Sequence, residues 1–277
     1  MLGGVVWRCR VGSRTRPYRA LLGARMRAQS SYRASFGLDL VSSLLIGLVE
    51  LAEVWVLYRA VDEIGGLDLT AALVVFGLAD TAFSIADLLV GHVDRLPDYL
   101  RAGTFDVFCL RPQPLLAQLI TSDISLRRLT RVGVGFAVLI VGLIANDVTL
   151  TPSSVLLVLL SLLTGTAICT GIFVAAAGAQ FFLIDAAEMT NSVVYGGRYA
   201  ANQPGSVWSR PLIAVFGFGV PMAFTGYLPT LTLLDLPVPW NLPDWAGWLA
   251  PLAAIWMWGL AGLSWRTGTR HYQGGGG

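Results

Sequence analysis

Four acidic residues lie inside long apolar stretches of the chain. Glu50 and Glu53 are one helical turn apart, and Asp80 and Asp87 follow in the next stretch. Carboxylates at membrane depth commonly carry protons or line a route for polar substrates. We expect Glu50, Glu53 and Asp80 to face a hydrated translocation pathway between protomers, and Asp87 to be an interfacial anchor.

The same acids are also compatible with three arrangements that involve no pathway, because no basic residue is expected inside a span to neutralise them. The acids could be protonated, lie nearer the outer interface than the apolar boundaries suggest, or pair with a partner subunit.

The basic residues exclude several kinds of catalysis. All 19 are arginine, whereas a phosphate-binding P-loop and a pyridoxal Schiff base each need a lysine. The histidines and cysteines are too scattered for a zinc or iron–sulfur site; they are His92, His271, Cys9, Cys109 and Cys169. We expect a non-catalytic chain that binds no metal and no cofactor of its own.

Composition indicates that lipid surrounds most of the chain. Hydrophobic residues make up 55% of its 277 residues and charged residues only 13%, about half the charged share of a soluble domain. The apolar residues gather in blocks of about 20, the length that crosses a bilayer as a helix. The pattern predicts an all-α integral membrane protein with six spans, at 37–58, 69–91, 131–150, 153–177, 211–233 and 245–265.

Arginine asymmetry predicts the orientation, since positively charged loops stay cytoplasmic. Residues 1–36 hold eight arginines and no acid, which is typical of a cytoplasmic interfacial helix rather than a cleaved signal peptide. With both termini cytoplasmic, Arg59 is the only arginine predicted outside. The predicted outer loops carry acids and an aromatic belt instead: Asp62, Glu63, Asp68, Asp147, Asp235, Asp244, Trp240, Trp245 and Trp248.

Two predicted cytoplasmic segments are long enough to hold structure. In the segment 92–130, Pro97 starts a short helix, Gly103 ends it, and Pro112 stops a second helix. This segment is either a lipid-anchored amphipathic loop or a docking surface for a cytoplasmic partner. The segment 181–210 is expected to be a broken amphipathic helix, serving as a simple chain reversal or as a gate. Prolines 221 and 229 predict a kink and a partly re-entrant stretch before the last span.

The whole pattern resembles the permease subunits of ABC type 2 transporters. Their Gly-x-x-Asp-x-x-x-Leu-Arg-Pro signature between spans two and three is similar to Gly103, Asp106, Leu110, Arg111 and Pro112 here. Three later stretches also resemble the family: FFLIDAAEMTNSVVYGGRYAANQPGSVW, GVPMAFTGYLPTLTLL and WRTGTRHYQ. The chain departs from the family pattern in two places. It has Phe181 and Phe182 where a Phe-Trp pair is usual, and Gln203, Pro204 and Gly205 where Tyr-Pro-Leu is usual.

The resemblance implies a half-transporter for the bacterial inner membrane, most simply an exporter. It would span the membrane over residues 37–270 and end in a cytoplasmic tail, 271–277. Its partners would be two ATP-binding cassette subunits, which hold ATP and Mg²⁺, and a second permease copy or a sister permease; no nucleic acid is involved. Residues 97–112 would form a coupling helix that docks on the ATPase. Its expected contacts are charged and apolar: Asp98, Arg101, Asp106, Arg111, and a ridge of Phe105 and Phe108.

Two further classes of function compete with this one. A proton-coupled secondary transporter would use the intramembrane carboxylates directly. An intramembrane enzyme has less support, because the chain has no HExxH motif and no recognisable catalytic set.

Overall fold

The computed structural model describes residues 33–122, 128–182 and 191–272. These residues form helices, and the β-structure among them is a single bridge between Ile64 and Leu67. The prediction of an all-α chain is confirmed for this part of the sequence. The interfacial helix predicted over 1–36 and the tail predicted over 271–277 lie mostly outside the described residues.

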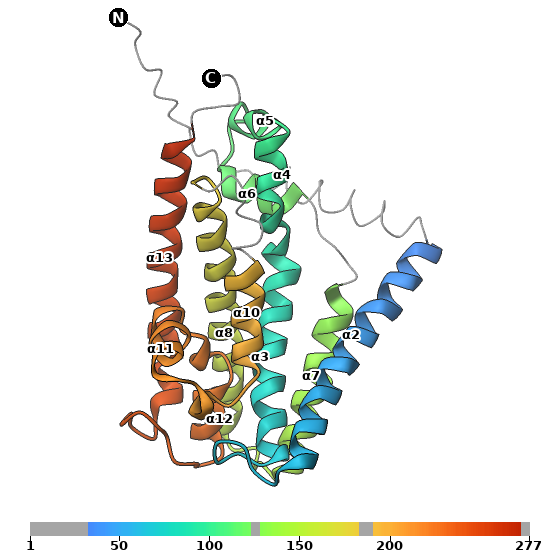
Figure 1. Ribbon diagram of the computed structural model, residues 1–277, viewed down its shortest axis with the longest axis vertical. Coiled ribbons are helices and arrows are strands. Elements are labelled where there is room, and N and C mark those ends of the chain that lie inside the picture. The colour runs from blue at the N-terminus through green and yellow to red at the C-terminus, as the bar shows by residue number, and fades with distance from the viewer. Residues whose placement is uncertain (1–32, 123–127, 183–190, 273–277) are drawn as a thin grey trace, which may run out of the picture.

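Five long helices run along the length of the molecule (Figure 1). They are α2 (Arg33–Ala60), α3 (Leu69–Val90), α7 (Arg128–Ala145), α8 (Pro152–Ala179) and α13 (Ala250–His271). Within the described residues, four helical stretches are long and apolar enough to cross a membrane, namely those of α3, α7, α8 and α13. A bent pair of shorter helices within 210–233 would make a fifth.

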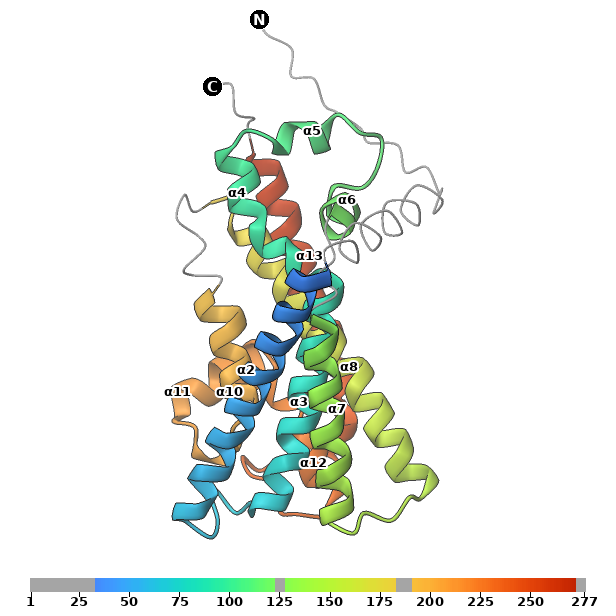
Figure 2. The same ribbon diagram turned by 90° about the vertical axis from the view of Figure 1, so that its right-hand side faces the viewer.

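Helix α3 is the centre of the bundle. Most of its residues are buried, as expected for a helix covered on every side, and Val74, Phe76 and Leu78 are at most 1% exposed. Helices α7 and α8 flank it (Figure 2). At Gly77 a Cβ atom would lie 2.5 Å from the Cα atom of Leu139 on α7. Small residues therefore let these two helices approach closely, as is common between membrane helices.

Short helices build one end of the molecule, which we call the inner end after the predicted orientation. The chain leaves α3 through a 3₁₀ turn, η1 (Gly91–Arg95), and then forms α4 (Leu96–Arg101), α5 (Phe105–Cys109) and α6 (Leu115–Ser122). The last turn of α13 lies at the same end (Figure 1). The opposite, outer end consists of the loops 61–68, 146–151 and 234–245.

The described parts of the segment predicted as a cytoplasmic broken helix, 181–210, lie at both ends of the molecule. At the inner end, Phe182 stacks on His271. Farther along the chain, Tyr195 donates a hydrogen bond to Asp94, and Ser206 donates one to the Gly65 carbonyl in an outer loop. The described helices of this segment are η2 (Asn191–Tyr195), α10 (Gly196–Ala201) and η3 (Gly205–Val207). The cytoplasmic placement of the segment stays a prediction.

The next segment, predicted as a fifth span over 211–233 with a kink at Pro221, is strongly bent. It comprises α11 (Arg210–Leu212), η4 (Ile213–Gly219), η5 (Met222–Phe224) and α12 (Tyr227–Leu233), with a bend of 63° between its two halves. The chain on its two sides meets at the outer end, where Trp208 stacks on Trp240 with ring centroids 6.3 Å apart. A 3₁₀ turn, η6 (Ala246–Leu249), then leads into α13. The expected kink is present at the break between the two halves, and the re-entrant stretch stays a prediction.

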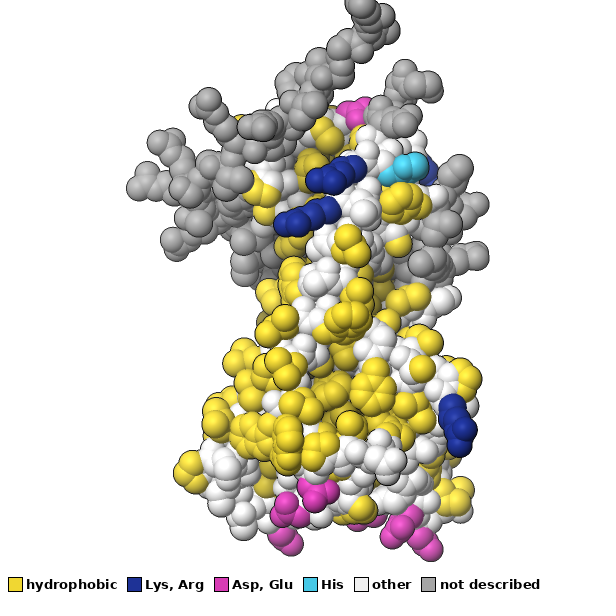
Figure 3. Space-filling view, turned by 90° about the vertical axis from the view of Figure 1, so that its left-hand side faces the viewer, with side chains coloured by type: hydrophobic (Ala, Val, Ile, Leu, Met, Phe, Trp, Pro, Cys, Tyr) yellow, Lys and Arg dark blue, Asp and Glu magenta, His cyan; other side chains and the backbone are white. Residues whose placement is uncertain are grey.

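The surface agrees with a membrane setting. Figure 3 shows acidic side chains at one end of the molecule and a broad hydrophobic surface next to them. The acids predicted for the outer loops are exposed there: Asp62, Glu63, Asp68, Asp147, Asp235 and Asp244. Between the ends, exposed side chains such as Leu163 (72%) and Ile255 (69%) are apolar, as lipid contact requires.

The new course of 191–210 can be tested with single cysteines in a background where the native cysteines are serine. Val207→Cys should react with a membrane-impermeant maleimide from the same side as Leu150→Cys in the loop 146–151, because both sites lie at the outer end. Leu110→Cys, at the inner end, should react only from the other side. Labelling of Val207→Cys together with Leu110→Cys would restore the cytoplasmic placement.

Candidate functional site

Four charged side chains from four helices meet inside the bundle; we call Glu50, Asp80, Arg131 and Arg198 the charged cluster. Arg198 donates from Nε to Asp80 Oδ1 at 3.1 Å and from Nη1 to Glu50 Oε1 at 2.9 Å. Its Nη2 lies 2.5 Å from both carboxylates. Arg131 Nη2 lies 3.3 Å from Glu50 Oε1. The two carboxylates and the two guanidinium groups of the charged cluster thus have no net charge.

The charged cluster lies deep in the molecule. Asp80 is 2% exposed and Arg198 6% exposed, and the Arg198 guanidinium also lies 5.2 Å from the centre of the Phe83 ring. Asp80 is the twelfth residue of α3, so at 1.5 Å per residue it lies about 18 Å from the outer end of that helix. This is about the middle of a hydrocarbon core of about 30 Å.

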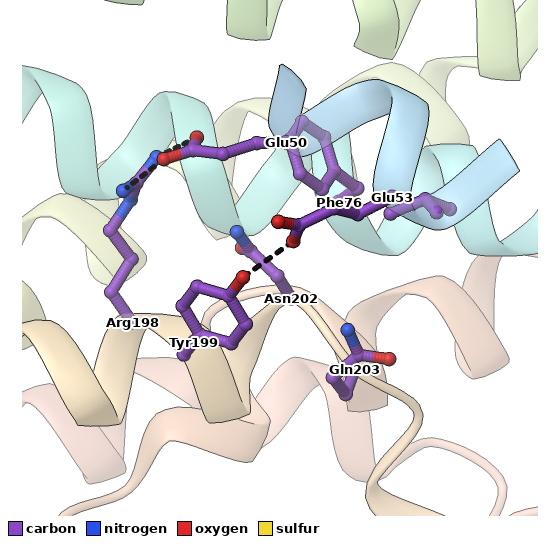
Figure 4. Close-up of a pocket in the computed structure, with 8 residues that line it drawn as sticks. Glu50, Glu53, Phe76, Arg198, Tyr199, Asn202 and Gln203 are labelled. Atoms are coloured by element: carbon purple, nitrogen blue, oxygen red, sulfur yellow. Dashed lines mark hydrogen bonds and ion pairs between the residues drawn. The ribbon is translucent and has the colours of Figure 1, made fainter. Parts of the chain in front are cut away.

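A pocket opens beside the charged cluster, between α2 and α10 (Figure 4). Glu53 points into it, and the Tyr199 hydroxyl donates a hydrogen bond to the Glu53 carboxylate. Asn202 and Gln203 add amide groups, and the empty space amounts to about 280 Å³ including its open side. This is close to the lower end of the range of about 300–1,000 Å³ for small-molecule sites.

The three acids predicted to line a pathway therefore have different environments. Glu53 is exposed, Glu50 is partly buried and held by two arginines, and Asp80 is closed off behind Arg198. The expectation that no base would neutralise them was wrong, because Arg198 lies at bundle depth and not in a cytoplasmic loop. The signal was present in the sequence: three acids at membrane depth require a cation, and Arg198 is the only arginine between Arg131 and Arg210.

Asp87 forms a separate ion pair, with Arg128. Its Oδ2 atom lies 3.2 Å from Arg128 Nε, and Arg128 Nη1 donates to the Asp87 backbone carbonyl at 2.6 Å. Arg128 is the first residue of α7. The pair ties the inner ends of α3 and α7 together.

At the inner end, Phe105 anchors the predicted coupling segment to the bundle. It is 1% exposed, and its ring contacts the rings of Tyr272 at 5.0 Å and Phe181 at 5.4 Å between centroids. Gly103 has φ +65°, a conformation that favours glycine and turns the chain between α4 and α5. The predicted ridge of Phe105 and Phe108 is therefore wrong for Phe105, since its ring is covered.

Polar contacts that the sequence does not predict fix the same turn. The Tyr272 hydroxyl donates to Asp106 Oδ1 at 2.8 Å, and burial followed by this hydrogen bond raises the pKa of Tyr272 to about 12. Buried Gln118 donates to the backbone carbonyls of Phe108 and Gln113. The Gln118 contacts hold the turn between α5 and α6. The Tyr272 contact has no local sequence signal, because Tyr272 lies 166 residues from Asp106.

The remaining predicted coupling residues form an exposed surface, which we call the inner tip. Leu110 is 81% and Val107 50% exposed, and Phe108 is half-buried with the Arg111 guanidinium 5.8 Å from its ring centre. Asp98, Arg101, Gly103 and Pro112 are exposed as well, while Asp106 is half-buried. The apolar part of this surface is therefore Val107 and Leu110, at i and i+3.

Removing Arg198 should be the most damaging change in the charged cluster. Arg198→Gln leaves Asp80 and Glu50 without their shared cation, and losing one member of a buried ion pair costs about 3–5 kcal/mol. Asp80→Asn should be milder, because Arg198 keeps Glu50. Adding Asp80→Asn to Arg198→Gln should recover part of the loss. Thermal unfolding of the detergent-solubilised protein measures this; equal destabilisation by both single variants would contradict the assigned pairing.

Comparison with known proteins agrees with this arrangement. The family model for ABC-2 family transporter proteins matches residues 44–276, which includes both the pocket and the inner tip. Comparisons with curated proteins and with solved structures gave no match. A match over most of the chain, in a protein whose described helices can cross a membrane several times, shows that the chain belongs to the ABC-2 transporter family, as a multi-pass permease.

Proposed function

We propose that this permease is the membrane half of an ATP-driven exporter and that a separate ATPase drives it through the inner tip. The observation that carries the proposal is the contrast within 98–112. One side of this segment is fastened to the bundle through Phe105 and Asp106, while Val107 and Leu110 are exposed. An apolar pair held rigidly at the end of a membrane bundle suits a groove on a soluble partner.

The power source must come from another protein. The chain has no lysine, so it cannot form the P-loop that holds ATP phosphates. We propose two ATP-binding cassette subunits as partners, with ATP and Mg²⁺ bound there and not by this chain. Asp98, Arg101 and Arg111 are exposed in the same segment and would provide charged contacts to the ATPase.

The proposed setting is the bacterial inner membrane, with both termini cytoplasmic and a second permease copy or a sister permease completing the pathway. Six crossings fit this setting. Helices α2, α3, α7, α8 and α13 would supply five. The sixth would lie between Phe182, which stacks on His271 at the inner end, and Ser206, which contacts Gly65 at the outer end. The stretch 211–233 would be a re-entrant pair on the outer side.

Proton coupling through the intramembrane acids has lost most of its support. Glu50 and Asp80 share Arg198, so a proton on either would break an ion pair inside the bundle. Glu53 keeps an open carboxylate, and its role is better explained by the pocket that it lines.

Leu110→Glu should abolish or greatly weaken co-purification of the ATPase, because it places a charge in the middle of the apolar docking pair. Leu150→Glu is a matched control, since Leu150 is equally exposed, at 81%, but lies at the outer end. The measurement is the amount of ATPase recovered with tagged permease from membranes, together with transport-coupled ATP hydrolysis.

Both variants should reach the membrane at wild-type levels, because neither side chain is covered. If Leu110→Glu retains the ATPase as well as Leu150→Glu does, the docking surface is not at the inner tip. Phe105→Ala is unsuitable for this test, since it opens a cavity beneath the segment.

A further inference from the structure

The pocket beside the charged cluster carries a surplus negative charge. Within the charged cluster, Arg131 and Arg198 balance Glu50 and Asp80. Glu53 stands outside this balance: among the described residues its carboxylate accepts one hydrogen bond, from the uncharged Tyr199 hydroxyl. One full negative charge therefore faces the open side of the pocket.

The depth of Glu53 makes this charge costly. It lies seven residues before the end of α2, about 10 Å from the outer end at 1.5 Å per residue. A carboxylate at such a depth cannot face lipid without a compensating partner. Its exposure in the single chain thus indicates a space that another charged or polar group occupies.

The other polar groups show what kind of partner fits. Asn202 Oδ1 lines the same pocket and is buried without a hydrogen-bond donor in the described part of the chain. Asn202 therefore offers an acceptor oxygen without a donor, and Glu53 offers a carboxylate whose one donor among the described residues is uncharged. The exposed Tyr199 ring lies beside them (Figure 4), and aromatic faces attract cations. Acceptors, a negative charge and an aromatic ring together favour an organic cation.

We propose that this pocket binds the cationic group of an amphipathic organic cation, with Glu53 as its counter-ion, and that such cations are the substrate class of the transporter. The assignment to transport rests on the proposed function, whereas the binding site rests on the pocket itself. The apolar part of the ligand would contact the apolar lining at Val54 and Phe76.

A pair of ions with the same shape and opposite charge tests the proposal directly. Binding of radiolabelled tetraphenylphosphonium and of tetraphenylborate is measured with the full chain in nanodiscs of zwitterionic lipid, with empty nanodiscs as the blank. The cation should bind at least tenfold more tightly than the anion. Glu53→Gln should weaken cation binding at least tenfold, and Asn202→Leu by a smaller factor.

Glu63→Gln is the matched control. Glu63 is also exposed but belongs to the outer loop 61–68, so its loss should leave cation binding unchanged. Equal binding of both ions, or unchanged cation binding in Glu53→Gln, would overturn the proposal. A third outcome would also overturn the proposal. If the wild type binds no cation and Glu53→Gln abolishes a dimer that the wild type forms, Glu53 pairs with a second copy of the chain instead.

The same variants in the complex with its ATPase separate this proposal from the proposed function. Cation-stimulated ATP hydrolysis that Glu53→Gln removes and Glu63→Gln retains would support both. Cation binding by a permease that recovers no ATPase from native membranes would contradict the proposed function alone. An intact complex that hydrolyses ATP but shows no preference for the cation would contradict the substrate class alone.

Discussion

The neutralisation of charge at bilayer depth is the constraint on which the arrangement of this protein depends. Arg198 lies between Asp80 and Glu50, in a place where an unpaired guanidinium or carboxylate would be severely destabilising. Satisfying all three groups requires α2, α3 and α10 to converge at one level. The pocket exists because they converge there, and the descending course of 191–208 follows from the same requirement.

The inner end has two different sides: one packs against the bundle, and the other is exposed for a partner. Phe105, Phe181 and Tyr272 form an aromatic contact that joins α5 to the ends of α8 and α13. A force applied at Leu110 would thus be carried by two long helices and not by a loose loop. These helices also pack closely on each other, where Gly178 faces Ser264. Movement at the inner tip would be transmitted to the bundle as a shift of this pair.

Sequence reasoning succeeded where the signal was local. The apolar runs 131–150 and 153–177 lie within a few residues of α7 and α8, and Pro97 and Gly103 mark the turns around α4. It failed where pairing is long-range. In the sequence, Arg198 favoured a cytoplasmic loop. Its carboxylate partners lie 118 and 148 residues away, and no local pattern predicts such long-range ion pairs. The kink at Pro221 was predicted from the proline itself, whereas the size of the bend, 63°, depends on how the stretch packs against the other helices.

The distance in sequence between Arg198 and its partners also matters during synthesis. Glu50 and Asp80 leave the ribosome long before Arg198, and at about 5–20 residues per second the 118 residues between Asp80 and Arg198 take roughly 6–24 seconds. During that interval Asp80 lacks its cation, and Glu50 can pair with Arg131 alone. The ion pairs that join α2, α3 and α10 therefore form only after the second half of the chain has been made.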